Sequence, residues 1–100
     1  MSVITSPHNE RIKLVRALQS QARARRKAGR VALEGVRLVR DALAAGERPD
    51  FVLHTPDADA PDKEAALLLA SLRAEAIPCL AVTPEVMAHA ADTQTPQGVI

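Results

Sequence analysis

The chain has 100 residues, of which 47% are hydrophobic, so it is long enough for one compact domain and too short for two. Its single aromatic residue, Phe51, excludes single-strand binding by stacking bases on aromatic side chains, and any nucleic-acid binding must rest on phosphate contacts and shape. Charge is divided unevenly, because residues 1–48 carry a formal charge of +7 and residues 49–100 carry −6.

A first helix is predicted from Ser6 to Ala22. Ser6 is a typical N-cap, and Pro7 suits the first helical position. Apolar residues then recur at helical spacing, at Ile12, Val15, Leu18 and Ala22. Polar side chains gather on the opposite face, and they are Asn9, Lys13, Arg16 and Arg23. The helix therefore has one side for a core and one basic side.

A dense positive patch follows. Eight residues hold five cations, which are Arg23, Arg25, Arg26, Lys27 and Arg30. Residues 30–34, with the sequence RVALE, lie between Gly29 and Gly35 and predict a short buried strand. Cations placed just before a strand-to-helix corner indicate a site for a polyanion, because the helix N-terminus adds oriented N–H groups. The alternative is a solvated basic face.

The next helix is predicted over 36–46, where Val36, Val39 and Leu43 share one face and Gly46 ends the helix. An i,i+4 pair of Arg37 and Asp41 supports it. Three further elements are predicted before the last helix: a strand over 50–55, a helix through Ala65, Leu68, Leu69, Leu72 and Ala76, and a strand over 78–83.

A short last helix begins after Thr83, a predicted N-cap followed by Pro84. Strands separated by helices indicate parallel pairing with helices on both faces of the sheet. The predicted fold class is α/β.

Signals for catalysis and for metal or cofactor binding are missing. No glycine-rich phosphate loop follows a predicted strand, and the three histidines and Cys79 lack metal-ligand spacing. Asp57, Asp59 and Asp62 lack the glycine and glutamate of a calcium loop and indicate turn chemistry. We therefore expect no catalytic, cofactor or metal residue in this chain. Without a signal peptide or a long apolar run, it is predicted to be cytoplasmic.

Three stretches in this order resemble a known family: ITSPHNERIKLVRAL, then RRKAGRVALEGVRLVRDALAAG, then TPQGV. They are similar to the N-terminal substrate-binding domain of SpoU-type RNA 2′-O-ribose methyltransferases, in the SPOUT superfamily. The resemblance implies a three-layer α/β/α sandwich with a mostly parallel sheet, like ribosomal proteins and kink-turn binders. It also implies RNA as the partner, with large-subunit rRNA as the expected substrate.

In the ribosomal proteins and kink-turn binders that this domain is expected to resemble, the end of the first strand and the start of the following helix meet RNA. Here that corner comprises Glu34, Gly35, Val36 and Arg37. Gly35 gives backbone freedom or close approach, and Glu34 is expected to orient a neighbouring group by accepting hydrogen bonds. The basic segment lacks the aromatic residue often found there in the family. The predicted RNA-binding residues are Asn9, Lys13, Arg16, Arg23, Arg25, Arg26, Lys27, Arg30, Gly35 and Arg37, with Glu34 as support.

The domain is predicted to span 1–92, with 93–100 as a linker toward a catalytic domain that this chain lacks. The family resemblance places the S-adenosylmethionine site, the catalytic residues and the main dimer contact in that domain. The full-length enzyme is therefore expected to be a homodimer, whereas this chain alone is expected to be inactive and monomeric. The alternative is a free-standing ribosome-associated RNA-binding protein without a catalytic partner domain.

Overall fold

A computed structural model describes residues 3–56 and 64–91. The helices in these residues are α1 (Glu10–Ser20), α2 (Ala22–Ala28), α3 (Val36–Ala44), α4 (Glu64–Ala74) and α5 (Pro84–Ala90). Two strands, β1 (Val52–His54) and β2 (Cys79–Ala81), pair in parallel with Leu53 opposite Leu80. Ile4 adds an isolated parallel bridge to Val82. The α/β class and the parallel pairing are confirmed, and the predicted linker at 93–100 lies outside the described residues.

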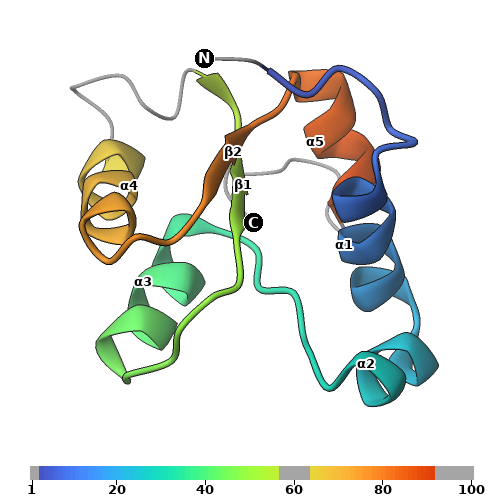
Figure 1. The fold of residues 1–100 in the computed structure, drawn as a ribbon, viewed down its shortest axis with the longest axis horizontal. Helices are drawn as coiled ribbons and strands as arrows, with labels where there is room; N and C mark the ends of the chain where they lie inside the picture. The colour runs from blue at the N-terminus through green and yellow to red at the C-terminus, as the bar shows by residue number, and fades with distance from the viewer. Residues whose placement is uncertain (1–2, 57–63, 92–100) are drawn as a thin grey trace.

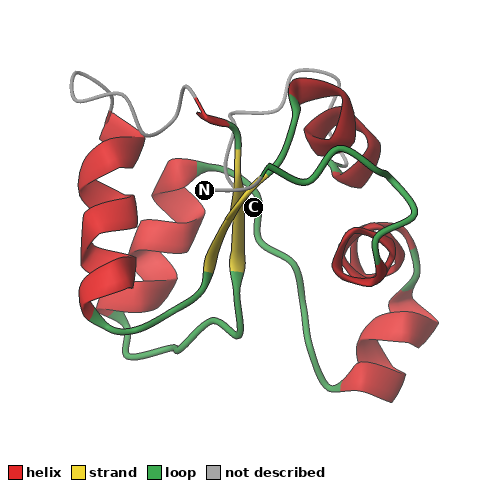
Figure 2. Ribbon diagram, turned by 45° about the horizontal axis from the view of Figure 1, so that its top comes forward, coloured by secondary structure: helices red, strands yellow, loops and turns green. Residues whose placement is uncertain are grey.

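Helices pack on both faces of this small sheet (Figures 1 and 2). Val52 belongs to a core cluster with residues of α3 and α4, while Leu53 belongs to a second cluster with residues of α1 and α5. Successive side chains of a strand point to opposite faces, so two adjacent residues of β1 serve two separate cores. α4 corresponds to the helix predicted through Ala65 and Ala76. Of the apolar residues predicted along its core face, all except Ala76 are buried. Ala76 lies beyond α4, exposed and with a positive φ of 60°.

The first helix is shorter than predicted. Asn9 rather than Ser6 is the N-cap, because its side chain accepts a hydrogen bond from the Arg11 N–H at 2.9 Å. Ser6 instead accepts from the His8 N–H, 3.2 Å away, and so stabilises the preceding turn. At the other end, α1 stops at Ser20, because Gln21 is extended and separates it from α2.

The basic segment at 23–30 is helical over most of its length. Residues 22–28 form α2, whose Ala, Arg and Lys composition favours helix. Gly29 ends the helix with a φ of 65°, and its N–H donates to the Arg25 carbonyl. Arg23 therefore lies on α2 and not on the polar face of α1.

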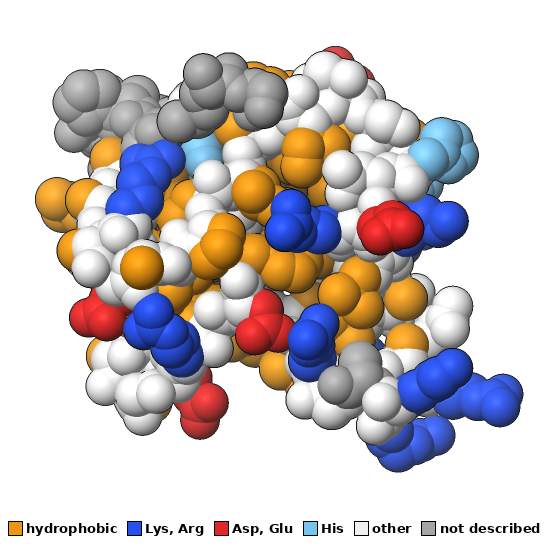
Figure 3. Space-filling model, viewed as in Figure 1, with side chains coloured by type: hydrophobic (Ala, Val, Ile, Leu, Met, Phe, Trp, Pro, Cys, Tyr) orange, Lys and Arg blue, Asp and Glu red, His pale blue; other side chains and the backbone are white. Residues whose placement is uncertain are grey.

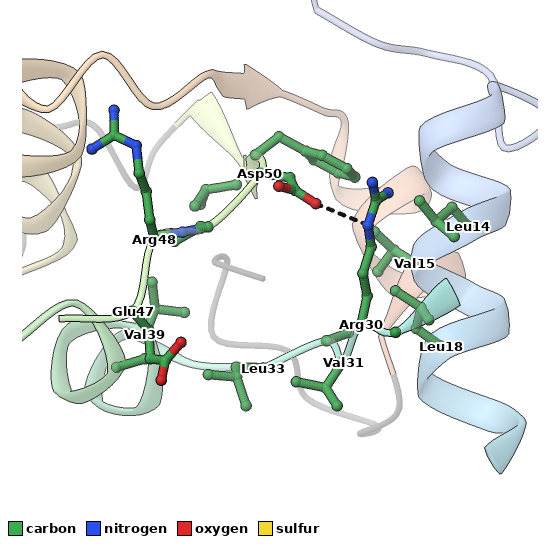
Figure 4. A pocket seen from close by; sticks show the side chains of 16 residues that line it. Leu14, Val15, Leu18, Arg30, Val31, Leu33, Val39, Glu47, Arg48 and Asp50 are labelled. Atoms are coloured by element: carbon green, nitrogen blue, oxygen red, sulfur yellow. Dashed lines mark ion pairs between the residues drawn. The ribbon is translucent and has the colours of Figure 1, made fainter. Parts of the chain in front are cut away.

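The predicted strand at 30–34 is wrong in this structure, since residues 31–34 pair with neither strand. A cavity of about 700 Å³ separates this segment from the start of β1 (Figure 4). Val31 keeps 66% of its surface exposed. A short apolar run gives the propensity for a strand but does not supply the neighbour to which it must bond.

The last helix begins as predicted. The Thr83 hydroxyl accepts a hydrogen bond from the Val86 N–H at 3.2 Å, and Pro84 occupies the first helical position. α5 buries Val86 and Met87 against α1, beside Ile12. None of the described helices is long and apolar enough to cross a membrane.

Candidate nucleic-acid interface

Helix α2 presents a group of exposed cations. The side chains of Arg23, Arg26 and Lys27, called the α2 cluster below, are exposed, and none forms an ion pair within residues 3–56 and 64–91. Lys and Arg side chains gather at the lower right of Figure 3, where Figure 1 places α2. Because no carboxylate of the described residues neutralises them, these three charges can face an anionic partner.

Arg25 differs from its three neighbours on α2. It is half-buried, and its Nη1 donates a hydrogen bond to the carbonyl oxygen of Leu18, 2.7 Å away, in the last turn of α1. The last carbonyls of a helix have no intrahelical partner, so this guanidinium satisfies one of them and fixes the angle between α1 and α2. Arg25 therefore supports the surface that carries the α2 cluster.

The predicted basic face of α1 has a mixed role. Lys13 is exposed and without an ion pair in the described part of the chain. Arg16 is also exposed, yet its Nη1 donates to the His89 carbonyl oxygen at 2.5 Å and links α1 to the end of α5. The Asn9 side chain is occupied in capping α1. Of these three predicted RNA contacts, Lys13 is the one whose side chain forms no hydrogen bond or ion pair with the described residues, whereas Asn9 and Arg16 each have one polar atom bonded within the fold.

Arg30 is partly neutralised. Its Nε lies 3.0 Å from a carboxylate oxygen of Asp50, and both side chains are more than half exposed. Figure 4 shows this pair beside the cavity. An exposed pair of this kind contributes little to stability. Arg30 can still turn one face of its guanidinium to a phosphate, but with less net charge than the α2 cluster offers.

The predicted corner is present, although no strand leads into it. Gly35 is buried, with a φ of 100°, a conformation that side chains with a Cβ rarely adopt. α3 starts immediately afterwards without a side-chain N-cap. Arg37 lies exposed in its first turn, and the predicted pair with Asp41 is not formed in the described structure. The corner thus joins a helix N-terminus to a guanidinium that has no ion pair with the described residues.

A hydrogen bond from a side chain of α1 positions the Glu34 carboxylate. One of its carboxylate oxygens accepts a hydrogen bond from Gln19 Nε2 at 3.2 Å. Glu34 therefore accepts a hydrogen bond, as a supporting residue would, but from Gln19, a partner that the sequence did not indicate. Gln19 lies 15 residues before Glu34, and no local pattern signals a contact over that separation.

Arg11 also has a partner that the sequence did not reveal. Its guanidinium carbon lies 5.8 Å from the centre of the Phe51 ring, in cation–π range. Phe51 is partly buried and packs against the second core cluster, so this contact ties Arg11 to the core.

His54 and Cys79 belong to the two strands of the sheet and not to the basic helices. His54 ends β1 and is buried; its Nδ1 lies 2.9 Å from the Thr55 carbonyl oxygen, and its Nε2 has no partner among the described residues. The Cys79 thiol is half-buried and donates to the Ile77 carbonyl oxygen. Within the described ranges, no three His, Cys, Asp or Glu side chains are grouped to hold a metal ion.

Comparison with known proteins gives this surface its context. Residues 9–100 match the model of the MRM3-like substrate binding domain. The chain belongs to the MRM3-like substrate-binding domain family. A search of curated proteins found no match. The family was thus identified correctly from the order of the three sequence stretches.

This MRM3-like domain resembles solved structures of RNA methyltransferases. A crystal structure of an RNA 2′-O ribose methyltransferase superposes with a TM-score of 0.80 at 26% identity, over 98% of this chain and 35% of the other. An rRNA methyltransferase from Sinorhizobium meliloti gives 0.75 at 26% identity, over 98% and 34%. Its AdoMet-bound form gives 0.73 at the same identity and coverage. This MRM3-like domain therefore spans about a third of each relative's length.

Proposed function

We propose that this chain is the RNA-recognition domain of an S-adenosylmethionine-dependent RNA 2′-O-ribose methyltransferase, acting in the cytoplasm on large-subunit (23S) rRNA. Membership of a substrate-binding family and the likeness to solved RNA and rRNA methyltransferases support the reaction class. The observation that carries the RNA-binding role is the α2 cluster, three exposed cations that have no acidic partner among the described residues.

The arrangement suits RNA because its cations fall into two kinds. The α2 cluster lies on a short helix where flexible, solvated side chains can follow a phosphate backbone without fixed geometry. Arg37 lies in the first turn of α3, two residues after the buried Gly35, so its side chain projects from a rigid part of the backbone. Phosphate contacts of the first kind set affinity, and a positioned arginine of the second kind sets orientation.

We further propose the complete three-layer α/β/α sandwich, with an architecture like that of ribosomal proteins and kink-turn binders. The separate cores on the two faces of β1 support this arrangement. The predicted domain boundary near residue 92 and the linker at 93–100 remain part of the same proposal.

We assign the binding of the methyl donor, S-adenosylmethionine, to the full-length protein and not to this chain. The cavity in Figure 4 is lined mainly by apolar side chains, and of its four charged residues Arg30 pairs with Asp50, Arg48 pairs with Glu75, and Glu47 is an acid. An adenosine and a methionine carboxylate need several free hydrogen-bonding groups. The residues here do not fit S-adenosylmethionine, so no catalytic step is assigned to them.

The proposal is tested by RNA binding of the 100-residue chain. Fluorescence anisotropy should show tighter binding to a large-subunit rRNA fragment than to an unrelated structured RNA of equal length, with duplex DNA weaker than both. Equal affinity for all three nucleic acids would reduce the surface to a general polyanion binder. Absence of binding at low salt would contradict the proposed function.

A further inference from the structure

Asp50 brings a carboxylate to the basic surface. It lies two residues before β1, and its Oδ2 is 3.0 Å from the Nε of Arg30 (Figure 4). Arg30 follows α2 directly, since its N–H donates to the Arg25 carbonyl oxygen, one residue beyond the C-cap Gly29. Arg30 is therefore fixed at the C-terminal end of the helix that carries the α2 cluster, and a more distant part of the chain neutralises it.

The contact between Arg30 and Asp50 is weak. Among the described residues the two are joined by an ion pair and by no hydrogen bond, whereas Arg40 both pairs with Glu64 and donates a hydrogen bond to it. The Arg30 and Asp50 side chains are 51% and 59% exposed, so water reaches both, and an exposed pair adds little to stability. Another anion can therefore replace Asp50 with little loss of stability.

We propose that Asp50 competes with RNA for Arg30: the carboxylate holds the guanidinium in the free protein, and a phosphate of the RNA replaces it in the complex. This inference rests on the proposed function, because it needs an RNA backbone bound to the α2 cluster. A backbone bound there holds further phosphates near Arg30 at a high effective concentration. A phosphate also accepts two parallel hydrogen bonds from a guanidinium, whereas Asp50 contacts this one at Nε.

The exchange of partners has a thermodynamic signature. Binding must break the ion pair, so Asp50 lowers the affinity for RNA, but Arg30 still gains a phosphate and counts toward the salt dependence of binding. If Arg30 instead stays with Asp50 in the complex, the guanidinium neutralises no phosphate and the salt dependence does not include it. Affinity and salt dependence together therefore distinguish a competitor from a permanent partner.

Arg30→Gln tests whether Arg30 reaches the RNA. Binding of the 100-residue chain to a large-subunit rRNA fragment is measured by fluorescence anisotropy across a salt series. This variant should reduce the slope of log K against log salt concentration by about 0.7 to 0.9, the value of one phosphate contact. An unchanged slope would show that Asp50 keeps Arg30 in the complex, and it would overturn the proposal.

Asp50→Asn tests the competition, and Glu47→Gln is its matched control. Glu47 is an exposed acid that lines the same cavity and forms no ion pair with the described residues. Asp50→Asn should raise RNA affinity about 2- to 5-fold, on the scale of one exposed ion pair, and keep the wild-type slope. Glu47→Gln removes the same charge and should raise affinity by less than about 1.5-fold, because salt screens exposed charges. Equal gains from both variants would mean that net charge alone matters, and they would contradict the proposal.

A double variant completes the cycle. When Arg30→Gln is already present, Asp50→Asn should raise affinity no more than Glu47→Gln does, because no guanidinium is left to release. Asp50→Ala should repeat the gain of Asp50→Asn, and circular dichroism should show an unchanged fold for these exposed substitutions. A gain that persists without Arg30 would refute the competition. If the wild type binds the rRNA fragment but these results fail, the proposed function stands without this inference; if the wild type does not bind, both are wrong.

Discussion

The Arg25 guanidinium lies 2.7 Å from the carbonyl oxygen of Leu18, so one arginine of the basic segment secures the end of α1 while its neighbours face solvent. The sequence alone grouped Arg25 with Arg23, Arg26 and Lys27 as equivalent phosphate contacts. The structure divides this group into one supporting residue and three available cations. The division determines which substitutions should affect folding and which should affect binding.

The first prediction follows from that division. Arg25→Ala should lower the free energy of unfolding by about 1 kcal/mol, since the lost bond involves a charged donor but is only half-buried. Arg26→Ala, on the same helix, should change it by less than about 0.5 kcal/mol. Urea unfolding followed by circular dichroism provides the measurement. Equal effects of the two substitutions would mean that the Leu18 contact does not stabilise the fold.

A second prediction concerns Arg37. Arg37→Ala should reduce the preference for the cognate rRNA fragment over unrelated RNA more than it reduces the salt dependence of binding. The reason is that this side chain projects from a rigid part of the backbone next to Gly35. Lys13→Ala, which removes an exposed and unpaired cation on α1, is the control for loss of charge. If both variants lose affinity equally for both RNAs, Arg37 acts only as a phosphate contact.

The third prediction concerns the methyl donor. Isothermal titration of the 100-residue chain with S-adenosylmethionine should give no heat of binding, and incubation with rRNA should transfer no methyl group. The physical reason is that the cavity is largely apolar and its Arg30 and Asp50 side chains pair with each other. Micromolar binding of the cofactor would contradict this assignment.

A fourth prediction concerns assembly. The chain alone should sediment as a monomer at low micromolar concentration, because the expected dimer contact belongs to the catalytic domain. The large exposed apolar side chains of the described residues are Val3, Val31, Leu33, Leu38 and Leu67, whereas a stable interface takes about 20 to 30 residues on each side. A tight dimer in sedimentation equilibrium would contradict the prediction.

Much of the fold could be predicted because its signals are local. Helical spacing identified the buried residues of α1 and α4, and Thr83 with Pro84 fixed the start of α5. The strand at 30–34 could not be settled in the same way, since pairing depends on a neighbour more than 15 residues away in sequence. The sequence also could not show whether Ser6 or Asn9 is the N-cap of α1, because both residue types cap helices equally well.

The sequence indicated which basic residues form the candidate site, but it did not indicate what each of them does. Exposed and engaged arginines have the same sequence signature, so the contacts of Arg16 with His89 and of Arg25 with Leu18 appear only in three dimensions. The anchoring of Glu34 by Gln19 was hidden for the same reason.

The salt dependence of RNA binding tests the central claim most directly. The triple variant Arg23→Gln, Arg26→Gln, Lys27→Gln removes the α2 cluster. A control triple variant, Arg40→Gln, Arg48→Gln, Arg73→Gln, removes the same charge from exposed residues elsewhere, two of which are ion-paired to Glu64 and Glu75. Both are compared with the wild type by the slope of log K against log salt concentration for an rRNA fragment.

Each lost phosphate contact reduces that slope by about 0.7 to 0.9. The α2 variant should therefore lose about 2 to 3 units of slope, and the control variant should lose less than about 1 unit. If the α2 variant keeps the wild-type slope, the basic helix is only a solvated surface and the RNA-binding role proposed for it is wrong.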